Sequence, residues 1–171
     1  SSDARQIVIL LILLALSAFF SSAETCLTTV NKMRIKSLAD DQNKNASLVL
    51  KLIEEKTQML SAILIGNNVV NLSASSLTTT FAMKLAKSSG MSDSVSAITG
   101  IATGIITILV LIFGEIIPKS LATMNAERLS LIYAKPIYGL TNILRPISFL
   151  MNQLSNGLMH LLHVKSNHSP A

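Results

Sequence analysis

Three long apolar stretches constrain the fold of this chain more than any other feature of its sequence. One begins with an almost wholly apolar run from Ile7 to Phe20, and the others lie at about 59–81 and 95–121. The hydrocarbon core of a bilayer is crossed by about 20 mostly apolar residues in a helix, which also satisfies its own backbone polar groups. The sequence therefore predicts an all-α integral membrane protein with three transmembrane helices per protomer, at about 7–30, 59–81 and 95–121.

The composition agrees with a lipid-embedded domain. Of the 171 residues, 50% are hydrophobic and 13% are charged, whereas about 25% of the residues in soluble domains are charged. This length allows one compact domain, so we expect a single transmembrane domain over 1–165 and a tail or linker over 166–171. The one cysteine, Cys26, excludes an intrachain disulfide and a cysteine-based zinc cluster.

A polar and basic segment at 31–56 separates the first two predicted spans. Within it, Leu48, Leu52 and Ile53 are spaced so that they would form one apolar helical face. We therefore expect short amphipathic helices here, on the cytoplasmic side of the membrane.

The segment that follows the third span is apolar but interrupted by prolines and basic residues, among them Pro136, Arg145 and Pro146. It contains no uninterrupted apolar run of the length that a span needs. We expect juxtamembrane amphipathic helices at about 125–163, with basic side chains directed toward the lipid headgroups. A fourth span at about 137–158 is the alternative.

Basic side chains set the expected orientation. The net charge is +5, and Lys and Arg residues gather at 31–56 and after Lys119, beside the apolar spans. We expect a multi-pass protein of the plasma (cell inner) membrane. By the positive-inside rule, its N-terminus would lie outside and its C-terminus in the cytoplasm. The sequence lacks a basic patch interleaved with aromatic residues, so we expect lipid and no nucleic acid as a partner.

Small polar residues recur within the predicted spans at helical spacing. Ser17 and Ser21 are four residues apart, as are Asn67 and Asn71, so each pair lies on one face of its helix. Glu115 lies near the end of the third span. If the spans have the predicted ends, three helices direct oxygen atoms toward one point in the cytoplasmic half of the membrane.

A carboxylate at this depth needs a partner. Insertion scales assign roughly 2.5–3.5 kcal/mol to a charge at the centre of a membrane helix, and a bound cation would offset the charge of Glu115. Gly114 and the helix break at Pro118 can free a backbone carbonyl as a further ligand. Hydroxyl, amide, carbonyl and carboxylate oxygens suit hard cations such as Mg²⁺, Ca²⁺ or Na⁺.

Simpler interpretations exist for each of these residues. The serine hydroxyls can bond their own backbone, the asparagines can join helices without binding an ion, and Glu115 can pair with Lys119. A pure scaffold of this kind predicts no stabilisation by any cation. No nucleotide-binding or hydrolytic motif is present in the sequence, so we do not expect an enzyme.

Three stretches together resemble a known family. They are Leu16–Thr25 (LSAFFSSAET), Ile65–Asn71 (IGNNVVN) and Phe113–Lys119 (FGEIIPK). In order and spacing they resemble the transmembrane domain of the CorC/CNNM family of magnesium transporters, and the resemblance covers nearly the whole chain. The third stretch is the most specific of the three.

The resemblance implies a function and a ligand set. Members export Mg²⁺, in proposed schemes coupled to Na⁺ entry, through a homodimer of three-helix protomers with a juxtamembrane belt. The implied ligands for a dehydrated Mg²⁺ are two hydroxyls, an amide oxygen, a backbone carbonyl and a carboxylate, from Ser17, Ser21, Asn67, Gly114 and Glu115. Asn71 lies nearby as a further ligand or as support. A membrane anchor that senses Mg²⁺ without transporting it is the alternative, since it requires the same ligands.

The resemblance also implies a missing part. Full-length relatives continue into a cytoplasmic CBS-pair domain, which binds nucleotide in many members. This chain ends shortly after the juxtamembrane region, so we expect an excised membrane domain that lacks the CBS-pair domain and its nucleotide regulation.

Overall fold

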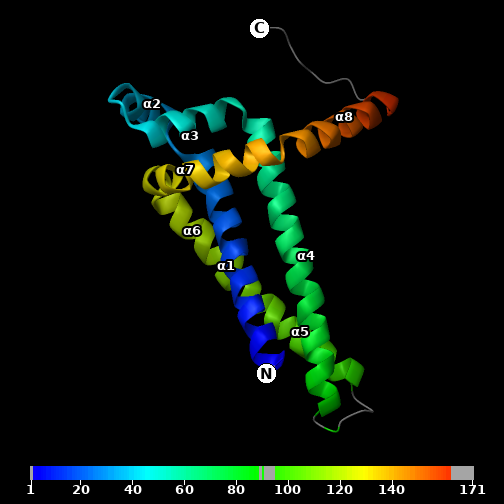
Figure 1. Cartoon of the computed structure of the whole chain (residues 1–171). Helices are drawn as coiled ribbons and strands as arrows, with labels where there is room; N and C mark the ends of the chain where they lie inside the picture. Colours follow the sequence, from blue (N-terminus) through cyan, green and yellow to red (C-terminus); the bar gives the residue numbers. More distant parts are fainter. Residues whose placement is uncertain (1, 89, 91–94, 163–171) are drawn as a thin grey trace.

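The computed structural model describes residues 2–88, 90 and 95–162. In this part of the chain every regular element is a helix (Figure 1), which confirms the all-α prediction. In chain order the elements are α1 (Ser2–Thr29), α2 (Lys32–Asp40), α3 (Lys44–Glu54), α4 (Lys56–Ser88), α5 (Val95–Leu111), the π-helical turn η2 (Ile112–Ile116), α6 (Ile117–Met124), α7 (Ala126–Ile143) and α8 (Arg145–Leu161). The predicted tail at 166–171 lies outside the described residues.

The described residues contain three helices that are long and apolar enough to cross a membrane, as predicted. They are Asp3–Thr29, Lys56–Ser88 and Ser96–Met124, the last running through α5, η2 and α6. The second span is longer than the predicted 59–81, because α4 runs from Lys56 to Ser88. Lys, Leu and Ala favour helix, and Gly90, with a positive φ of 76°, follows the end of α4.

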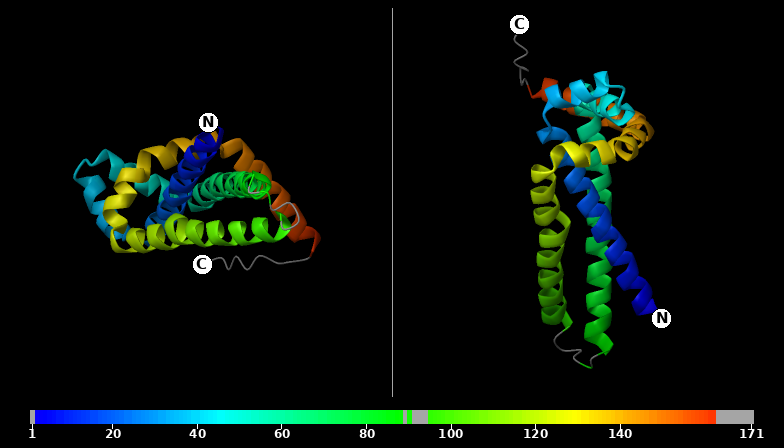
Figure 2. Two further views of the ribbon diagram at one scale, coloured as in Figure 1. Left: turned by 90° about the horizontal axis from the view of Figure 1, so that it is seen from below. Right: turned by 90° about the vertical axis from the view of Figure 1, so that its left-hand side faces the viewer.

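The three spans stand side by side beneath a crossing layer of shorter helices (Figures 1 and 2). α1 and the third span run in the same direction, and α4 runs opposite to both. The N-terminus therefore lies at the same end as the connection between α4 and α5, where Lys84 Nζ is 3.0 Å from Asp3 Oδ1. The other end carries α2, α3, α7 and α8.

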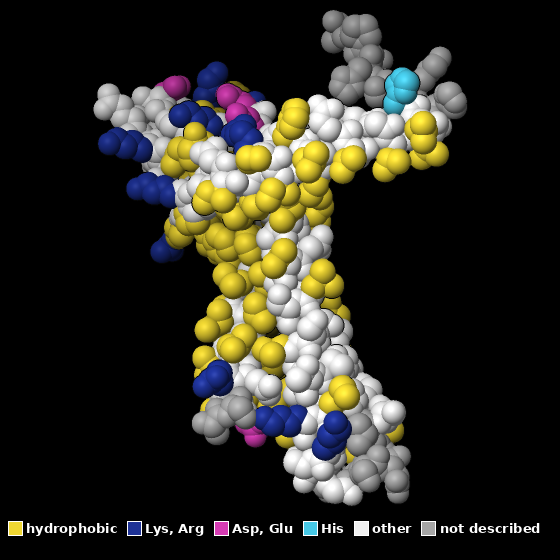
Figure 3. All heavy atoms as spheres, turned by 45° about the vertical axis from the view of Figure 1, so that its right-hand side comes forward, with side chains coloured by type: hydrophobic (Ala, Val, Ile, Leu, Met, Phe, Trp, Pro, Cys, Tyr) yellow, Lys and Arg dark blue, Asp and Glu magenta, His cyan; other side chains and the backbone are white. Residues whose placement is uncertain are grey.

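α7 and α8 lie across the spans and form what we call the belt (Figure 1). The alternative of a fourth span at 137–158 is wrong for this structure, because Leu144 divides that segment between two helices. Neither is among the described helices that could cross a membrane. α8 exposes large apolar side chains, among them Leu150, Leu154 and Leu158. Figure 3 shows apolar side chains along the underside of this helix.

The main apolar core lies where the belt and α3 meet the spans. It includes Val49 and Leu52 of α3, Met59 and Ile63 of α4, and Ile137 of α7. Leu48 and Ile53 pack against the same core, which confirms the predicted apolar face of α3. This core holds one end of α1 and of α4 in fixed register.

The rest of the span surface is apolar and exposed. Ile101, Ile105 and Ile108 of α5 are more than half exposed, at 65%, 56% and 58%, and Figure 3 shows apolar side chains along the length of the spans. A soluble monomer rarely presents a continuous apolar surface of this extent. The surface fits a lipid environment.

Candidate intramembrane polar site

A hydrogen bond joins two of the predicted site residues across the bundle. Ser17 Oγ of α1 donates to Asn71 Oδ1 of α4 at 3.1 Å, and Ser17 is only 2% exposed. The alternative in which the predicted serines bond their own backbone does not hold here. By contrast, Thr79 and Thr107 donate to the carbonyl four residues earlier, at 3.1 and 2.7 Å.

Two buried oxygen atoms lie one helical turn nearer the belt. Because α1 and α4 are antiparallel, the residue four after Ser17 lies level with the residue four before Asn71, which places Ser21 opposite Asn67. Among the described residues, neither Ser21 Oγ nor Asn67 Oδ1 has a hydrogen-bond partner, and both atoms are buried. An unsatisfied buried polar group costs roughly 1–3 kcal/mol. Binding of a ligand or a water by these two oxygens would therefore be favourable.

A close contact fixes this register. An added Cβ at Gly66 would lie 2.6 Å from Cζ of Phe20, so the Phe20 ring already rests against the backbone of α4. A side chain at this position would force the ring or the helix to move. The glycine therefore allows α1 and α4 to approach closely at the level of the two unpaired oxygens.

Gly114 brings the third span to the same place. It is buried in η2, and an added Cβ would lie 3.2 Å from Ser17 Oγ and 3.3 Å from Leu14 Cδ1. Pro118 has no N–H, so the carbonyl of Gly114 lacks its ordinary donor four residues later. The local backbone is π-helical, and the N–H of Ile117 bonds to the carbonyl of Ile112. Such turns occur frequently at functional sites.

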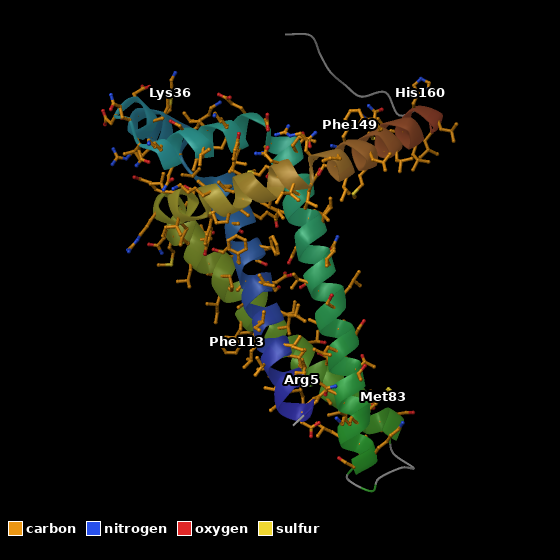
Figure 4. All side chains as sticks on the ribbon, in the orientation of Figure 1. Arg5, Lys36, Met83, Phe113, Phe149 and His160 are labelled. Carbon is orange, nitrogen blue, oxygen red and sulfur yellow. The ribbon has the colours of Figure 1, made fainter. Side chains whose placement is uncertain are left out.

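The neighbours of Gly114 point in different directions. Phe113 is 52% exposed and lies on the outer surface of the third span (Figure 4). Glu115 is half-buried and, with Asn71, lines a cavity of about 220 Å³ between α4 and α5. Within the described part of the chain it forms no ion pair. The alternative pairing with Lys119 is therefore absent from this structure.

The predicted residues thus form two levels. Ser17 contacts both Asn71 and Gly114, and Glu115 lines the same cavity as Asn71. Ser21 and Asn67 form the level nearer the belt. The described residues hold no cluster of three histidine, cysteine, aspartate or glutamate side chains, so the oxygens here are mainly neutral ones around one carboxylate.

Two residues that line the site were not predicted from the sequence. Thr103 and Thr107 of α5 line the same cavity as Glu115. The signal was present in their spacing, because steps of four residues lead from Thr103 through Thr107 and Leu111 to Glu115 on one helical face.

A hydrogen bond and a ring contact that were not predicted from the sequence join α1 to the belt. Ser22 Oγ donates to the hydroxyl of Tyr133 in α7 at 3.3 Å. The Tyr133 ring also meets Phe19 edge to face, with centroids 5.1 Å apart and planes at 82°. Phe19 and Ser22 flank Ser21, so a shift of the belt would reach the helix that carries the site.

The fold and the arrangement of polar residues define a multi-pass, all-α membrane domain with a buried polar site between its three spans. Residues 8–171 match the family described as the Cyclin M transmembrane N-terminal domain, and the chain belongs to this family. It is 40% identical over 158 residues to a UPF0053 protein of Haemophilus influenzae, covering 92% of this chain and 36% of that protein.

Two further relatives extend the comparison. The UPF0053 inner membrane protein YfjD of Escherichia coli is 34% identical over 152 residues, which cover 89% of this chain and 34% of YfjD. A chloroplastic DUF21 domain-containing protein of Arabidopsis thaliana is 36% identical over 166 residues, covering 97% of this chain and 24% of the relative. The chain thus spans about a third or less of the length of these curated relatives.

Proposed function

We propose that this domain moves Mg²⁺ across the membrane, as an exporter, through the site formed by Ser17, Ser21, Asn67, Asn71, Gly114 and Glu115. The observation that carries the proposal is the pair of buried, unpaired oxygens, Ser21 Oγ and Asn67 Oδ1, beside the Ser17–Asn71 bond. An amide oxygen and a hydroxyl without partners are ready ligands for a hard cation. The proposed activity is transport rather than catalysis.

The number and kind of oxygens favour Mg²⁺ as the ion. Mg²⁺ requires near-octahedral coordination at about 2.0–2.1 Å, and the six residues can offer one oxygen each. The carboxylate of Glu115 would supply charge, the carbonyl of Gly114 lacks its ordinary donor at Pro118, and the remaining oxygens are neutral. Because Mg²⁺ loses water reluctantly, a full set of replacement oxygens is the expected device for taking it into the membrane.

In the proposed cycle, the ion enters from the belt end and meets Ser21 and Asn67 first. It then displaces the Ser17 hydroxyl from Asn71 and takes Glu115 as its counter-charge. Release occurs at the opposite end, and Na⁺, a candidate coupling ion, occupies the emptied oxygens during the return. The order follows from the two levels of the site along the spans.

The proposal assigns the belt end to the cytoplasm and the N-terminus to the outside. The support is the basic side chains of α2 and α3, which by the positive-inside rule favour the cytoplasmic face; they are Lys32, Arg34, Lys36, Lys44 and Lys51. Two copies would associate as a homodimer in the plasma membrane. In a longer protein, a CBS-pair domain would follow α8 on the cytoplasmic side.

A membrane anchor that senses Mg²⁺ is the second candidate function. The observation in its favour is the contact of α7 with both α1 and α4, the two helices that carry Ser21 and Asn67. Occupancy of the site could therefore move the belt and any domain attached to it. A sensor would bind Mg²⁺ without carrying it across the membrane.

Ion flux in vesicles that contain the 171-residue chain distinguishes the two functions. We expect Mg²⁺ flux with the unchanged chain, loss of flux with Asn67→Ala, and retention with Asn68→Ala, whose side chain is exposed on the next position of the same helix. Binding of Mg²⁺ without flux would favour the sensor. Equal flux in both variants would remove Asn67 from the site.

A further inference from the structure

The cavity at Glu115 continues away from the belt, beyond the residues assigned to the ion site. Its volume is about 220 Å³, and it lies between α4 and α5. Six of its lining residues carry polar side chains: Asn71, Ser75, Thr78, Thr103, Thr107 and Glu115. Four of these residues carry hydroxyls and belong to neither function proposed above: Ser75, Thr78, Thr103 and Thr107.

The polar lining has a direction. From Asn71 to Thr78, α4 runs toward its connection with α5. From Glu115 in η2 back to Thr103 in α5, the third span leads toward the same connection (Figure 1). One turn further along α5, Thr99 Oγ1 is buried and has no partner among the described residues. A line of hydroxyls therefore leads from the ion site toward the end that carries the N-terminus.

These hydroxyls remain able to accept hydrogen bonds. Thr107 Oγ1 donates its proton to the carbonyl of Thr103 at 2.7 Å, but a hydroxyl oxygen also has two acceptor lone pairs. Ser75 and Thr107 are exposed and lie at the opening of the cavity, whereas Thr78 is buried in its wall. Water, or the water shell of a cation, can bind to such a lining.

A neighbouring cavity offers an internal comparison. It has a similar volume, about 280 Å³, and shares Asn71 with the first, but apart from Ser17 and Asn71 its lining is apolar, including Leu10, Leu14 and Leu109. Water needs polar partners in a cavity, and cavities lined by Leu, Ile and Phe remain dry. The two cavities beside Asn71 thus have similar volumes, but one has a polar lining and the other an apolar one.

We propose that the cavity between α4 and α5 is a water-filled vestibule that receives a hydrated divalent cation on the side of the membrane away from the belt. At about 30 Å³ of liquid volume per water, the cavity holds on the order of seven waters, and protein-bound Mg²⁺ usually keeps several of its waters. The assignment of the cation rests on the proposed function, whereas the presence of water does not.

Accessibility to a charged thiol reagent tests the vestibule. Cys26 is the one cysteine of the chain and is buried, so a Cys26→Ser background is suitable for single cysteines at Ser75 and Thr107. A small cationic methanethiosulfonate reacts only with a hydrated thiolate. The control is Leu10→Cys in the apolar cavity, because Leu10 and Thr107 each lie seven residues before the level at which Ser17 meets Gly114.

We expect Ser75→Cys and Thr107→Cys to react at least about tenfold faster than Leu10→Cys, when the reagent is applied to the face that carries the N-terminus. Spheroplasts and inverted membrane vesicles expose the two faces separately. Ser75→Cys is nearly isosteric, which guards against misfolding. Equal rates at the three positions, or reaction only from the belt face, would overturn the vestibule.

Addition of MgCl₂ during labelling tests the cation separately. We expect Mg²⁺ to slow modification of Thr107→Cys and to leave Leu10→Cys unchanged. Fast labelling without protection by Mg²⁺ would retain the water-filled vestibule and contradict the proposed Mg²⁺ function. The two failures are therefore distinguishable.

Discussion

The hydroxyl of Ser17 donates to the amide oxygen of Asn71 across the interface between α1 and α4, at 3.1 Å. This bond occupies the amide oxygen that the proposal assigns to the ion. One turn toward the belt, Ser21 Oγ and Asn67 Oδ1 remain unpaired. The structure thus has one level of oxygens that are hydrogen-bonded to each other and one level of oxygens that are unpaired. A bound cation would break the Ser17–Asn71 bond and coordinate both oxygens.

Replacement of Ser17 by alanine separates stability from ion binding. Interhelical hydrogen bonds in membranes contribute about 0.6 kcal/mol on average, so Ser17→Ala should lower the free energy of unfolding by less than about 1 kcal/mol. It should nevertheless remove most of the stabilisation by Mg²⁺, which thermal unfolding with and without the ion measures. An unchanged Mg²⁺ response would exclude Ser17 as a ligand.

Gly114→Ala should disturb the site more than its size suggests. The new Cβ would lie 3.2 Å from Ser17 Oγ, and added methyl groups in packed sites cost about 1–3 kcal/mol. Gly104→Ala is the matched control, because its Cβ would meet nothing within 4 Å and alanine favours helix by about 0.8–1.0 kcal/mol. Thermal unfolding should show a lower midpoint for the first variant and an equal or higher one for the second. The reverse order would contradict the contact with Ser17.

Tyr133 should connect the belt to α1 mainly through its ring. Tyr133→Phe removes the 3.3 Å bond from Ser22 but retains the contact with Phe19, so we expect a loss of at most about 1 kcal/mol. Tyr133→Ala also removes an aromatic pair worth about 0.5–1.5 kcal/mol beyond its buried area, and should be clearly less stable. Equal midpoints for the two variants would show that the ring contributes nothing.

Periodicity and hydropathy were sufficient to predict the spans and the faces of their polar residues. Apolar length predicts a membrane helix directly, and a spacing of four predicts that Ser17 and Ser21 share a face. These signals are local, so they do not depend on how the helices pack. The same holds for the apolar face of α3, which includes Leu52.

Features that arise from contacts between helices were not predictable in the same way. The π-helical turn at Ile112–Ile116 combines a proline effect with packing of Gly114 against Ser17. Which serine is paired and which is unpaired depends on the register of α1 against α4. The break at Leu144 was signalled by Pro146, but the crossing direction of the belt is set by its core contacts with α3 and the spans.

The most direct test of the account measures thermal unfolding of the purified 171-residue chain against MgCl₂, with Asn67→Ala beside Asn68→Ala. Binding to the folded state stabilises it by about 2.7 kcal/mol at a ligand concentration 100 times Kd. We predict that Mg²⁺ raises the midpoint of the unchanged chain and of Asn68→Ala. Asn67→Ala should lose this response and, without Mg²⁺, be at least as stable as the unchanged chain, because it removes an unpaired buried oxygen. An equal response to Mg²⁺ in Asn67→Ala, or none in the unchanged chain, would contradict an intramembrane cation site at these residues.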